Sequence, residues 1–402
     1  MKFNLRPGDV PSCTGRGMRP MLLLGRAGLA LWAICSSAGP FNQASAQSPH
    51  HSAPSHPSAI PLGVPCVFYP TATSPVTSVR SRRVDLPPLR PTVAEPVAVS
   101  VAFNGDGTLL GVAGDDHTIR IVATDSATQI ACLIGHQDWV RSLVWRNDSN
   151  GLVSAGDDGR ILRWGVAAGD KRWQATEICQ FPYRISSVVP RPGSDELAVV
   201  GFSTEVSFVD GTSGAVRRTI KRDRRDTACL AFDPSGKVLV IGDQLGNVEI
   251  WDVAMEKRLH RLSGHSRRVR AVAMGPGGAR FSTAGEDGRV VQWSLADANP
   301  IWQSNRLAAR LQSLVWIDGE LLAAGGADNA IHLIDASTGQ EMAVLHGHVG
   351  SVVDLETHGD RLASCSFDAT VRFWDGVHQM LQERKHLTRP VSRIEPENVD
   401  VR

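Results

Sequence analysis

The sequence lacks the motifs that mark most cofactor-dependent enzymes. None of its seven cysteines lies in a CxxC pair, so zinc ribbons, thioredoxin-like redox sites and CxxCH haem attachment find no support. There is no Gly-x-Ser-x-Gly elbow, phosphate-binding glycine loop, metal-ligating cluster or carboxylate couple outside the repeats described below. Cysteines in apolar segments such as IACLIGH are expected to be small buried side chains. We therefore predict that the chain is not an enzyme and has no catalytic residue, metal site or cofactor.

An excess of charge of one sign is also missing. The chain has 42 Lys and Arg against 41 Asp and Glu, a net charge of +1. Residues 97–384 hold 29 basic against 35 acidic residues, so the part that carries the repeats is mildly acidic. Binding to a phosphate backbone needs a concentrated basic face. Nucleic acid is therefore not an expected partner.

Residues 1–46 have the order of an export signal: a basic lead, an apolar run and then small residues. The sequence Ala44-Ser45-Ala46 predicts cleavage before Gln47 and export to the periplasm or the extracellular space. Two alternatives stay open. An uncleaved segment would anchor the protein in a membrane and would be its only membrane contact, although the apolar run is short for this. A cytoplasmic protein with an apolar amino end is the other alternative.

The next segment, residues 47–80, is rich in Pro, Ser and His and is expected to be a disordered spacer, because it cannot bury enough apolar surface to offset the entropy of ordering. Residues 387–402 are expected to be a flexible tail. The globular part should therefore lie within residues 81–386.

A repeat with a period in the low forties begins near residue 97. Its third strands read TIRIVA, RILRWG, EVSFVD, NVEIWD, RVVQWS, AIHLID and TVRFWD. One aromatic or aliphatic position recurs in each, at spacings of 42, 45, 42, 42, 41 and 40 residues. Short alternating strands between Gly and Asp turns at this period predict the blades of a propeller. The recurring positions are Val122, Trp164, Val209, Trp251, Trp293, Ile334 and Trp374.

In these repeats the chain resembles the WD40 (β-transducin-like) family. Trp251-Asp252 and Trp374-Asp375 match one half of its signature, and the Gly-His pairs at 135–136, 264–265 and 347–348 match the other. The resemblance implies an all-β fold, a seven-bladed WD40 propeller preceded by the signal-like segment and the Pro-rich spacer. The repeats span about 97–136, 137–178, 179–222, 223–265, 266–306, 307–348 and 349–384.

The resemblance also implies a structural tetrad in which a His, a Ser or Thr, an Asp and a Trp hydrogen-bond to one another inside a blade. A hydrolase triad is not expected, because the same set recurs three times. The other blades have lost most of the set, although Asp116 and Asp328 keep the turn position, and we expect them to depend on packing alone. The complete sets are His136, Ser154, Asp158 and Trp164; His265, Thr283, Asp287 and Trp293; and His348, Ser364, Asp368 and Trp374.

Two segments leave alternatives open. The outer strand of the last blade is either QMLQERKHL after Trp374 or a segment around Ser81 to Leu86, and family practice favours the second because it would close the ring. The basic stretch at residues 217–225 is either an outer strand whose charges prevent edge-to-edge association or a contact for an anionic membrane or cell-wall polymer.

Family register places a set of arginines on one rim of the propeller, with a tryptophan as an apolar anchor and two carboxylates nearby. Arg and Trp are enriched in the energetically dominant part of protein interfaces. We therefore predict a non-catalytic protein-interaction scaffold, monomeric itself, whose partner is a protein or peptide rich in carboxylates. Ordinary solvated charges, a small-ligand sensor or enzyme that uses the central channel, and a cytoplasmic regulatory WD40 protein remain alternatives. The residues of this rim are Trp139, Arg141, Arg184, Arg268, Arg270, Arg310, Asp157 and Glu286.

Overall fold

The computed structural model describes residues 79–88, 95–146, 151–166, 172–222, 227–377 and 379–380. All of them lie in one compact unit that spans residues 60–402. The expected signal segment, nearly all of the spacer and the tail lie outside the described residues. None of the helices in the described part has the length and apolar character needed to span a bilayer.

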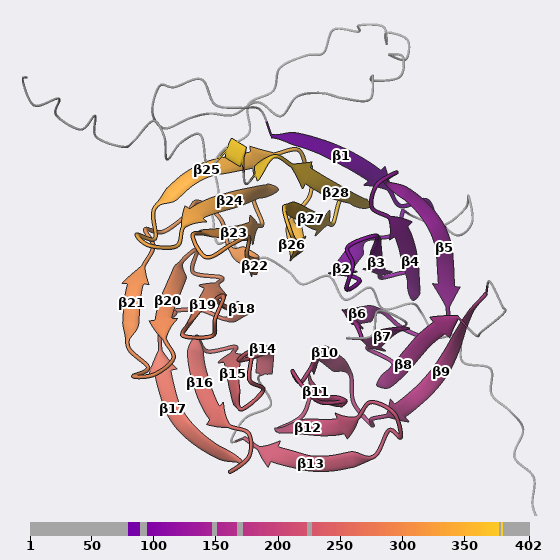
Figure 1. The fold of residues 1–402 in the computed structure, drawn as a ribbon, viewed down its shortest axis with the longest axis horizontal. Coiled ribbons are helices and arrows are strands. Elements are labelled where there is room, and N and C mark those ends of the chain that lie inside the picture. The colour runs from indigo at the N-terminus through magenta and orange to yellow at the C-terminus, as the bar shows by residue number, and fades with distance from the viewer. Residues whose placement is uncertain are drawn as a thin grey trace, which may run out of the picture. The chain divides into compact units, whose positions relative to one another are not determined.

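The described chain forms seven four-stranded antiparallel sheets arranged around a ring (Figure 1). The strands form where the sequence alternates apolar and polar residues, and Gly or Asp turns separate them. In the first six sheets the innermost strand comes first and the chain then moves outward; in the seventh, the outer strand is β1, from the start of the described chain. The prediction of an all-β, seven-bladed propeller is confirmed.

The strands have the following bounds. The inner strands are β2 (Ala98–Phe103), β6 (Val140–Trp145), β10 (Ile185–Pro190), β14 (Thr227–Phe232), β18 (Val269–Met274), β22 (Leu311–Trp316) and β26 (Val352–His358). The second strands are β3 (Leu109–Gly114), β7 (Gly151–Gly156), β11 (Glu196–Gly201), β15 (Val238–Asp243), β19 (Arg280–Gly285), β23 (Leu321–Gly326) and β27 (Arg361–Ser366). The third strands are β4 (Thr118–Ala123), β8 (Arg160–Val166), β12 (Glu205–Asp210), β16 (Asn247–Asp252), β20 (Val290–Ser294), β24 (Ala330–Asp335) and β28 (Thr370–Asp375). The outer strands are β5 (Thr128–Ile134), β9 (Trp173–Gln180), β13 (Val216–Lys221), β17 (Lys257–Ser263), β21 (Pro300–Gln303), β25 (Glu341–His346) and β1 (Arg80–Asp85).

The ring is closed by β1, which pairs antiparallel with β28 in the seventh blade (Figure 1). Of the two candidate segments, the outer strand is therefore the one that precedes the first repeat. Arg82 joins this blade to the first one, since its Nε lies 2.9 Å from Asp375 Oδ2 and its Nη1 donates to the carbonyl oxygen of Thr124 at 2.8 Å. Closure by a distant segment removes an open sheet edge.

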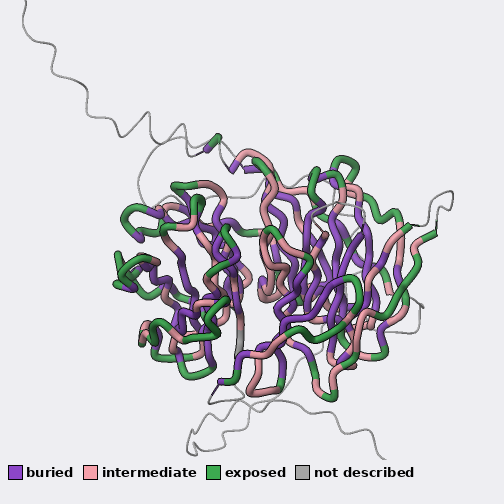
Figure 2. Tube along the Cα trace, turned by 60° about the horizontal axis from the view of Figure 1, so that its bottom comes forward, coloured by how far each residue is buried: buried purple, intermediate pink, exposed green. Residues whose placement is uncertain are grey.

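The core lies between the blades. One buried cluster combines Ile119 and Ile121 of the first blade with Trp145 and Trp164 of the second, and similar clusters fill the other junctions. Buried residues follow the strands and exposed residues gather at the loops (Figure 2). Trp145 also donates its indole N–H to the carbonyl oxygen of Ala102 at 2.8 Å. Each blade is thus stabilised mainly by its two neighbours.

The inner strand of the seventh blade carries two carboxyl groups, Asp354 and Glu356. In the other six blades the position aligned with Asp354 holds Ser, Cys or Ala. The position aligned with Glu356 holds Ala or Val. Asp354 Oδ2 accepts the N–H of Val101 in the first blade at 3.0 Å, across the junction where the ring closes. Alternation along a strand brings residues two apart to the same face, so the repeat itself holds a carboxylate couple, whereas the sequence-based expectation concerned only couples outside the repeats.

These two groups make the closing junction sensitive to pH. Burial raises the pKa of Asp354 to about 6. Burial and the charge of Asp354 raise the pKa of Glu356 from 4.5 to about 8. No hydrogen bond within the described part of the chain reaches the Glu356 carboxyl. The folded protein thus holds a proton that the unfolded chain releases, so stability falls as pH rises from about 4.5 to about 8.

Glu356→Gln removes this loss. We expect the variant to match the wild type near pH 4.5 and to be more stable by at least about 1 kcal/mol at pH 9, since one pKa unit corresponds to about 1.4 kcal/mol. Thermal unfolding between pH 4.5 and pH 9 measures the difference. Asp360→Asn, an exposed carboxyl of the same blade, is the control and should leave the profile unchanged. Equal profiles for Glu356→Gln and the wild type would contradict this account.

Candidate functional site

One face of the propeller is built from two kinds of loop, and we call it the loop face. Its loops connect the outer strand of one blade to the inner strand of the next, and its turns connect the second and third strands. In six blades the first residue of the turn donates its N–H to the carbonyl oxygen of the residue just before the inner strand. Examples are Asp157 to Trp139 at 2.9 Å and Phe202 to Arg184 at 3.0 Å. The backbone therefore presents these paired positions in register around the ring.

The structure brings the four side chains of each expected tetrad together. In the second blade Trp164 donates its indole N–H to Ser154 Oγ at 2.8 Å, and Ser154 Oγ lies 2.7 Å from His136 Nε2. His136 Nδ1 lies 2.9 Å from Asp158 Oδ2. The fifth and seventh blades repeat these contacts at 2.7–3.0 Å.

The direction of these hydrogen bonds follows from the donor inventory. Because the Ser hydroxyl accepts from the indole, its single proton goes to His Nε2, so the imidazole carries its own proton on Nδ1 and donates it to Asp. A neutral ring satisfies the whole set. Burial lowers the pKa of His348 despite the nearby Asp368 carboxylate, which agrees with a neutral ring.

The Asp of each tetrad also holds the loop face in place. Asp158 accepts the backbone N–H groups of Gln137, in the loop before the second blade, and of Arg160, at the end of the turn, at 2.9 and 3.0 Å. Burial alone would raise the pKa of Asp158, but His136 and these backbone donors outweigh it and lower the pKa. The carboxylate therefore fixes a loop and a turn together.

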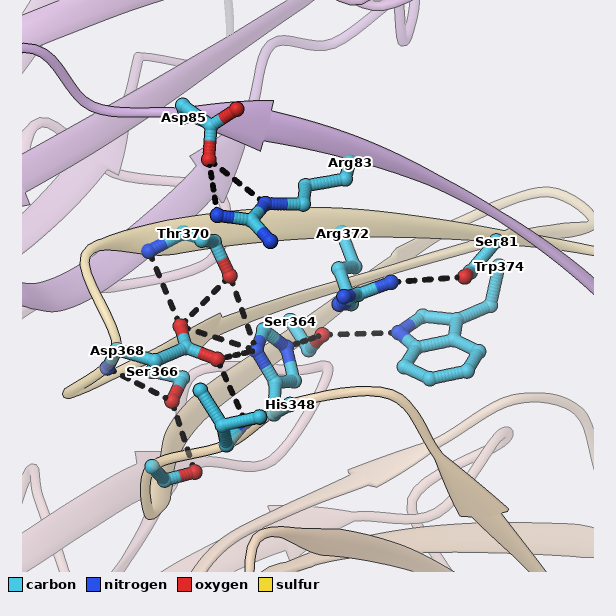
Figure 3. A network of polar contacts seen from close by, with 12 residues as sticks. Ser81, Arg83, Asp85, His348, Ser364, Ser366, Asp368, Thr370, Arg372 and Trp374 are labelled. Carbon is cyan, nitrogen blue, oxygen red and sulfur yellow. Dashed lines mark hydrogen bonds and ion pairs between the residues drawn. The ribbon is translucent and has the colours of Figure 1, made fainter. Parts of the chain in front are cut away.

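The seventh blade shows the most extended network (Figure 3). Asp368 lies beside His348 and accepts the backbone N–H of Val349 at 2.8 Å and the hydroxyl of Thr370 at 2.6 Å. Arg372 Nη1 donates to Ser81 Oγ of β1 at 3.0 Å. The closing strand is thus connected to the blade that carries this tetrad.

The fourth blade has lost the tetrad but not its buried polar network. Glu249 Oε2 accepts the indole N–H of Trp251 and the Nε–H of Arg222, both at 3.0 Å. Arg222 stands at the start of the loop that leads to this blade, as His136, His265 and His348 do in their loops, and its side chain is 2 % exposed. The expectation that this blade depends on packing alone was wrong, because a buried indole and a buried loop each still need a polar partner.

The first and sixth blades use the same strand position. In the first, Arg120 lies 2.7 Å from Asp116 and donates to the carbonyl oxygen of Pro87 at 3.0 Å. In the sixth, His332 lies between Glu341 at 2.5 Å and Asp328 at 3.1 Å. Burial opposes its charge, yet these two carboxylates raise the pKa of His332 to about 9. Packing alone was a wrong expectation here too.

A signal for these networks was present in the sequence. Arg120, Glu249 and His332 each stand two residues before the position equivalent to Trp, in the middle of an otherwise apolar strand. A charged residue in such a place is almost never buried without a partner. The partner of Glu249 could not be read from the sequence, since Arg222 and Glu249 are 27 residues apart and belong to different blades.

The basic stretch at 217–225 begins in β13, the outer strand of the third blade, as the first of the two interpretations expects. Arg217 pairs with Asp210, Arg218 Nη2 lies 2.8 Å from Glu196, and Arg222 is buried against Glu249. Three of the four basic residues that the structure describes in this stretch are thus paired, which reduces the charge available to an anionic polymer. Residues 223–226 lie outside the described residues.

The rim residues of the second and third blades form one compact group. Arg141 makes two contacts with Asp157, Nε to Oδ1 at 3.0 Å and Nη2 to Oδ2 at 2.7 Å. The same guanidinium lies over the Trp139 ring, 4.5 Å from its centre. Arg184 of the next blade lies 3.9 Å from Asp157. Asp157 is 6 % exposed and Trp139 is 38 % exposed, so a buried carboxylate orients a half-buried arginine that lies against an exposed tryptophan.

The rim residues of the fifth and sixth blades are arranged differently. Arg270 Nε lies 2.7 Å from Glu286 Oε1, an ion pair that is not aligned as a hydrogen bond. Arg268 and Arg310 make no ion pair with any described residue. The eight predicted rim residues therefore form two groups, and only part of their positive charge is free.

Apolar side chains on the loop face were not among the predicted binding residues. Phe202 and Phe367 occupy the turn position that Asp157 and Glu286 fill elsewhere, and they are 62 % and 53 % exposed. Val349 is exposed in the loop before the seventh blade. The signal was an aromatic residue at a turn, where Gly, Asn and Asp are the usual choices.

The described residues contain no group of three or more His, Cys, Asp or Glu placed to hold a metal ion. A cavity of about 150 Å³ opens near Asp195 and Pro190, at the ends of the strands that face away from the loop face. Glu196, which lines it, is paired with Arg191 and Arg218 at 2.7 and 2.8 Å. Its carboxylate is thus occupied.

Glu249→Gln tests the buried network of the fourth blade. It removes the charge that Arg222 and Trp251 share, and we expect a loss of about 3 kcal/mol in the free energy of unfolding, because breaking a buried ion pair is costly. Combining it with Arg222→Met should recover most of the loss, since the two changes then remove the pair together. Urea unfolding gives both values. Lys257→Ala, at an exposed position of the same blade, should cost no more than about 0.5 kcal/mol. A loss below 1 kcal/mol for Glu249→Gln would show that packing suffices.

The chain matches the model of a known repeat family. The family described as "WD domain, G-beta repeat" matches residues 94–122, 127–165, 256–294 and 339–375. Three of these matches end in the blades that carry complete tetrads, and the fourth lies in the first blade. The third, fourth and sixth blades, which have no complete tetrad, are the repeats that the family model does not match over most of their length.

Several characterised proteins are similar to the chain over the propeller. Autophagy-related protein 16 of Arabidopsis thaliana is 24% identical over 287 residues, which are 68% of this chain and 55% of that protein. Protein groucho of Drosophila melanogaster is 27% identical over 274 residues, 67% of this chain and 36% of the relative. Pre-mRNA-processing factor 19 of Oryza sativa subsp. japonica is 24% identical over 242 residues, 57% and 46% respectively. The matched region is about half of each relative or less. With its seven blades, its tetrads and these matches, the chain belongs to the WD40-repeat family of β-propellers.

Proposed function

We propose that this protein is a non-catalytic scaffold that binds a protein or peptide partner through the loop face. Fold alone does not define the function of a propeller, so the proposal depends on the side chains of that face. Family membership supports binding as the general role. The proposed surface is centred on the second and third blades, where Trp139, Arg141, Arg184 and Phe202 lie in adjoining loops and turns.

The observation that carries the proposal is the orientation of Arg141. Its guanidinium is held on one side by the buried Asp157 carboxylate and on the other by the face of Trp139. A side chain fixed before binding loses little entropy when a partner arrives. Trp and Arg are also the residues most enriched among those that dominate binding energy. Nothing in the fold itself requires an exposed tryptophan at this position.

The alternative of an enzyme or small-ligand sensor has less support. Asp354 and Glu356 are an unusual titratable pair among the inner strands, but Asp354 is engaged by the Val101 N–H, and Glu356 lies half-buried in the same junction. The cavity near Asp195 has its buried carboxylate paired with two arginines. The loop face, by contrast, combines exposed aromatic rings with arginines held in place.

The proposed setting is outside the cytoplasm, as the order of residues 1–46 suggests. Mass spectrometry of the mature protein from its native cells tests this directly. A polypeptide that begins at Gln47 supports export, and one that retains residues 1–46 argues for the membrane-anchored or cytoplasmic alternatives.

Photocrosslinking tests the binding surface. A photoreactive residue in place of Phe202 should give a discrete protein adduct in intact cells, and adding Trp139→Ala should reduce its yield at least about tenfold, because a central anchor typically contributes 2 kcal/mol or more. The same photoreactive residue in place of Met255, exposed in a turn on the opposite face, is the matched control. Equal adducts from positions 202 and 255, or an adduct that survives Trp139→Ala, would exclude this surface as the binding site.

A further inference from the structure

The arginines of the loop face differ in whether the protein supplies their counter-charge. Arg141 and Arg184 share the Asp157 carboxylate, and Arg270 has Glu286. Arg268 and Arg310, which directly precede β18 and β22 of the fifth and sixth blades, have no ion pair within the described residues. Arg267 and Arg306 in the same two loops are exposed and equally without one. The free positive charge therefore gathers over these two blades.

Arg268 is the most telling member, because its side chain is half-buried. Its Nε is buried and has no hydrogen-bond acceptor. Burial, and then the neighbouring charge of Arg270, lower the pKa of Arg268. A guanidinium in this position is normally paired, because an ion that loses water without gaining a partner is costly.

The groups around Arg268 do not supply that partner. Glu286 attracts it but is already in contact with Arg270. Cys229 is close to both arginines, but burial raises the pKa of its thiol to about 12, so it carries no negative charge. Arg184 faces the Asp157 of the preceding blade, whereas the preceding blade offers Arg268 the neutral Gln244 at the corresponding turn.

The two halves of the rim can be compared through their carboxylates. Asp157 serves Arg141 and Arg184, one from its own blade and one from the next. Glu286 stands at the same turn position of the fifth blade, with Arg270 in its own blade and Arg310 at the start of the next. The fifth blade also has Arg268 at the position where the second blade has Trp139. Ala327, at the turn of the sixth blade, brings no further acid.

We propose that this sector is an anion site, in which carboxylates of an acidic segment of the partner bind Arg268 and Arg310. The inference rests on the proposed function and adds which part of the surface recognises the partner's charge. Trp139 and Arg141 anchor the partner, and Arg268 and Arg310 make binding selective for its carboxylates. Carboxylates fit the planar guanidinium fork. Nucleic acid is less suitable, because residues 97–384 carry more acidic than basic residues and would repel an extended polyanion.

Fluorescence anisotropy with a labelled octaglutamate peptide tests this with the full chain at low salt. We expect saturable binding that Arg268→Gln weakens about tenfold, as loss of a charge-assisted hydrogen bond does. Arg310→Gln should weaken it less. Lys237→Gln removes one exposed charge from the opposite end of the strands and should change nothing.

Thermal unfolding of the free protein gives a second readout. Arg268→Gln should not lower Tm, since the side chain has no partner in the fold to lose, whereas Arg141→Gln should lower it. Several outcomes would overturn the inference: no saturable binding of the peptide, equal effects of Arg268→Gln and Lys237→Gln, a clear fall in Tm for Arg268→Gln, or tighter binding of labelled single-stranded DNA than of the peptide. If the adduct at position 202 still depends on Trp139 while Arg268→Gln leaves the affinity for the peptide unchanged, the scaffold proposal stands and the anion site does not.

Discussion

The structure depends on the need to satisfy polar groups that are buried inside each blade. A buried indole N–H or charged side chain left without a partner is costly, so a blade with such groups must also bring their partners into place. Three blades do so with the His, Ser or Thr, Asp and Trp tetrad, and three others do so with Arg120, Glu249 or His332. In nearly every case the partners include a residue of the loop before the blade or of its turn. The hydrogen bonds that satisfy the buried polar groups of a blade therefore also hold its surface loop and turn in place.

This link gives the loop face its character. Asp158, Asp287 and Asp368 accept backbone N–H groups from a loop and a turn, so the residues next to them are held before any partner binds. On this ordered frame, Asp157 and Glu286 add a second level of order by orienting Arg141 and Arg270. A scaffold needs a surface of fixed shape and charge, because every side chain that is ordered only on binding reduces affinity.

Seven blades and three complete tetrads could be predicted, because both follow from the spacing of residues along the sequence. The substitute networks could not. Arg222 and Glu249 lie in different blades, and only the fold shows that they meet. The rim arginines were placed correctly by register, but the sequence could not tell that Asp157 serves two of them while Arg268 has none, since this depends on side-chain directions. Asp354 and Glu356 were overlooked for a simpler reason: comparison of the seven inner strands shows them only once the strands are aligned.

The central claim is that every indole at the repeated third-strand position is held by a buried polar network, whether or not the blade has a tetrad. Hydrogen exchange of the indole N–H groups, followed by NMR on protein labelled at tryptophan, tests it most directly. The account predicts that Trp251, bound to Glu249, exchanges as slowly as Trp164, Trp293 and Trp374, with exposed Trp139 as the fast reference. Exchange of Trp251 at a rate close to that of Trp139 would contradict it.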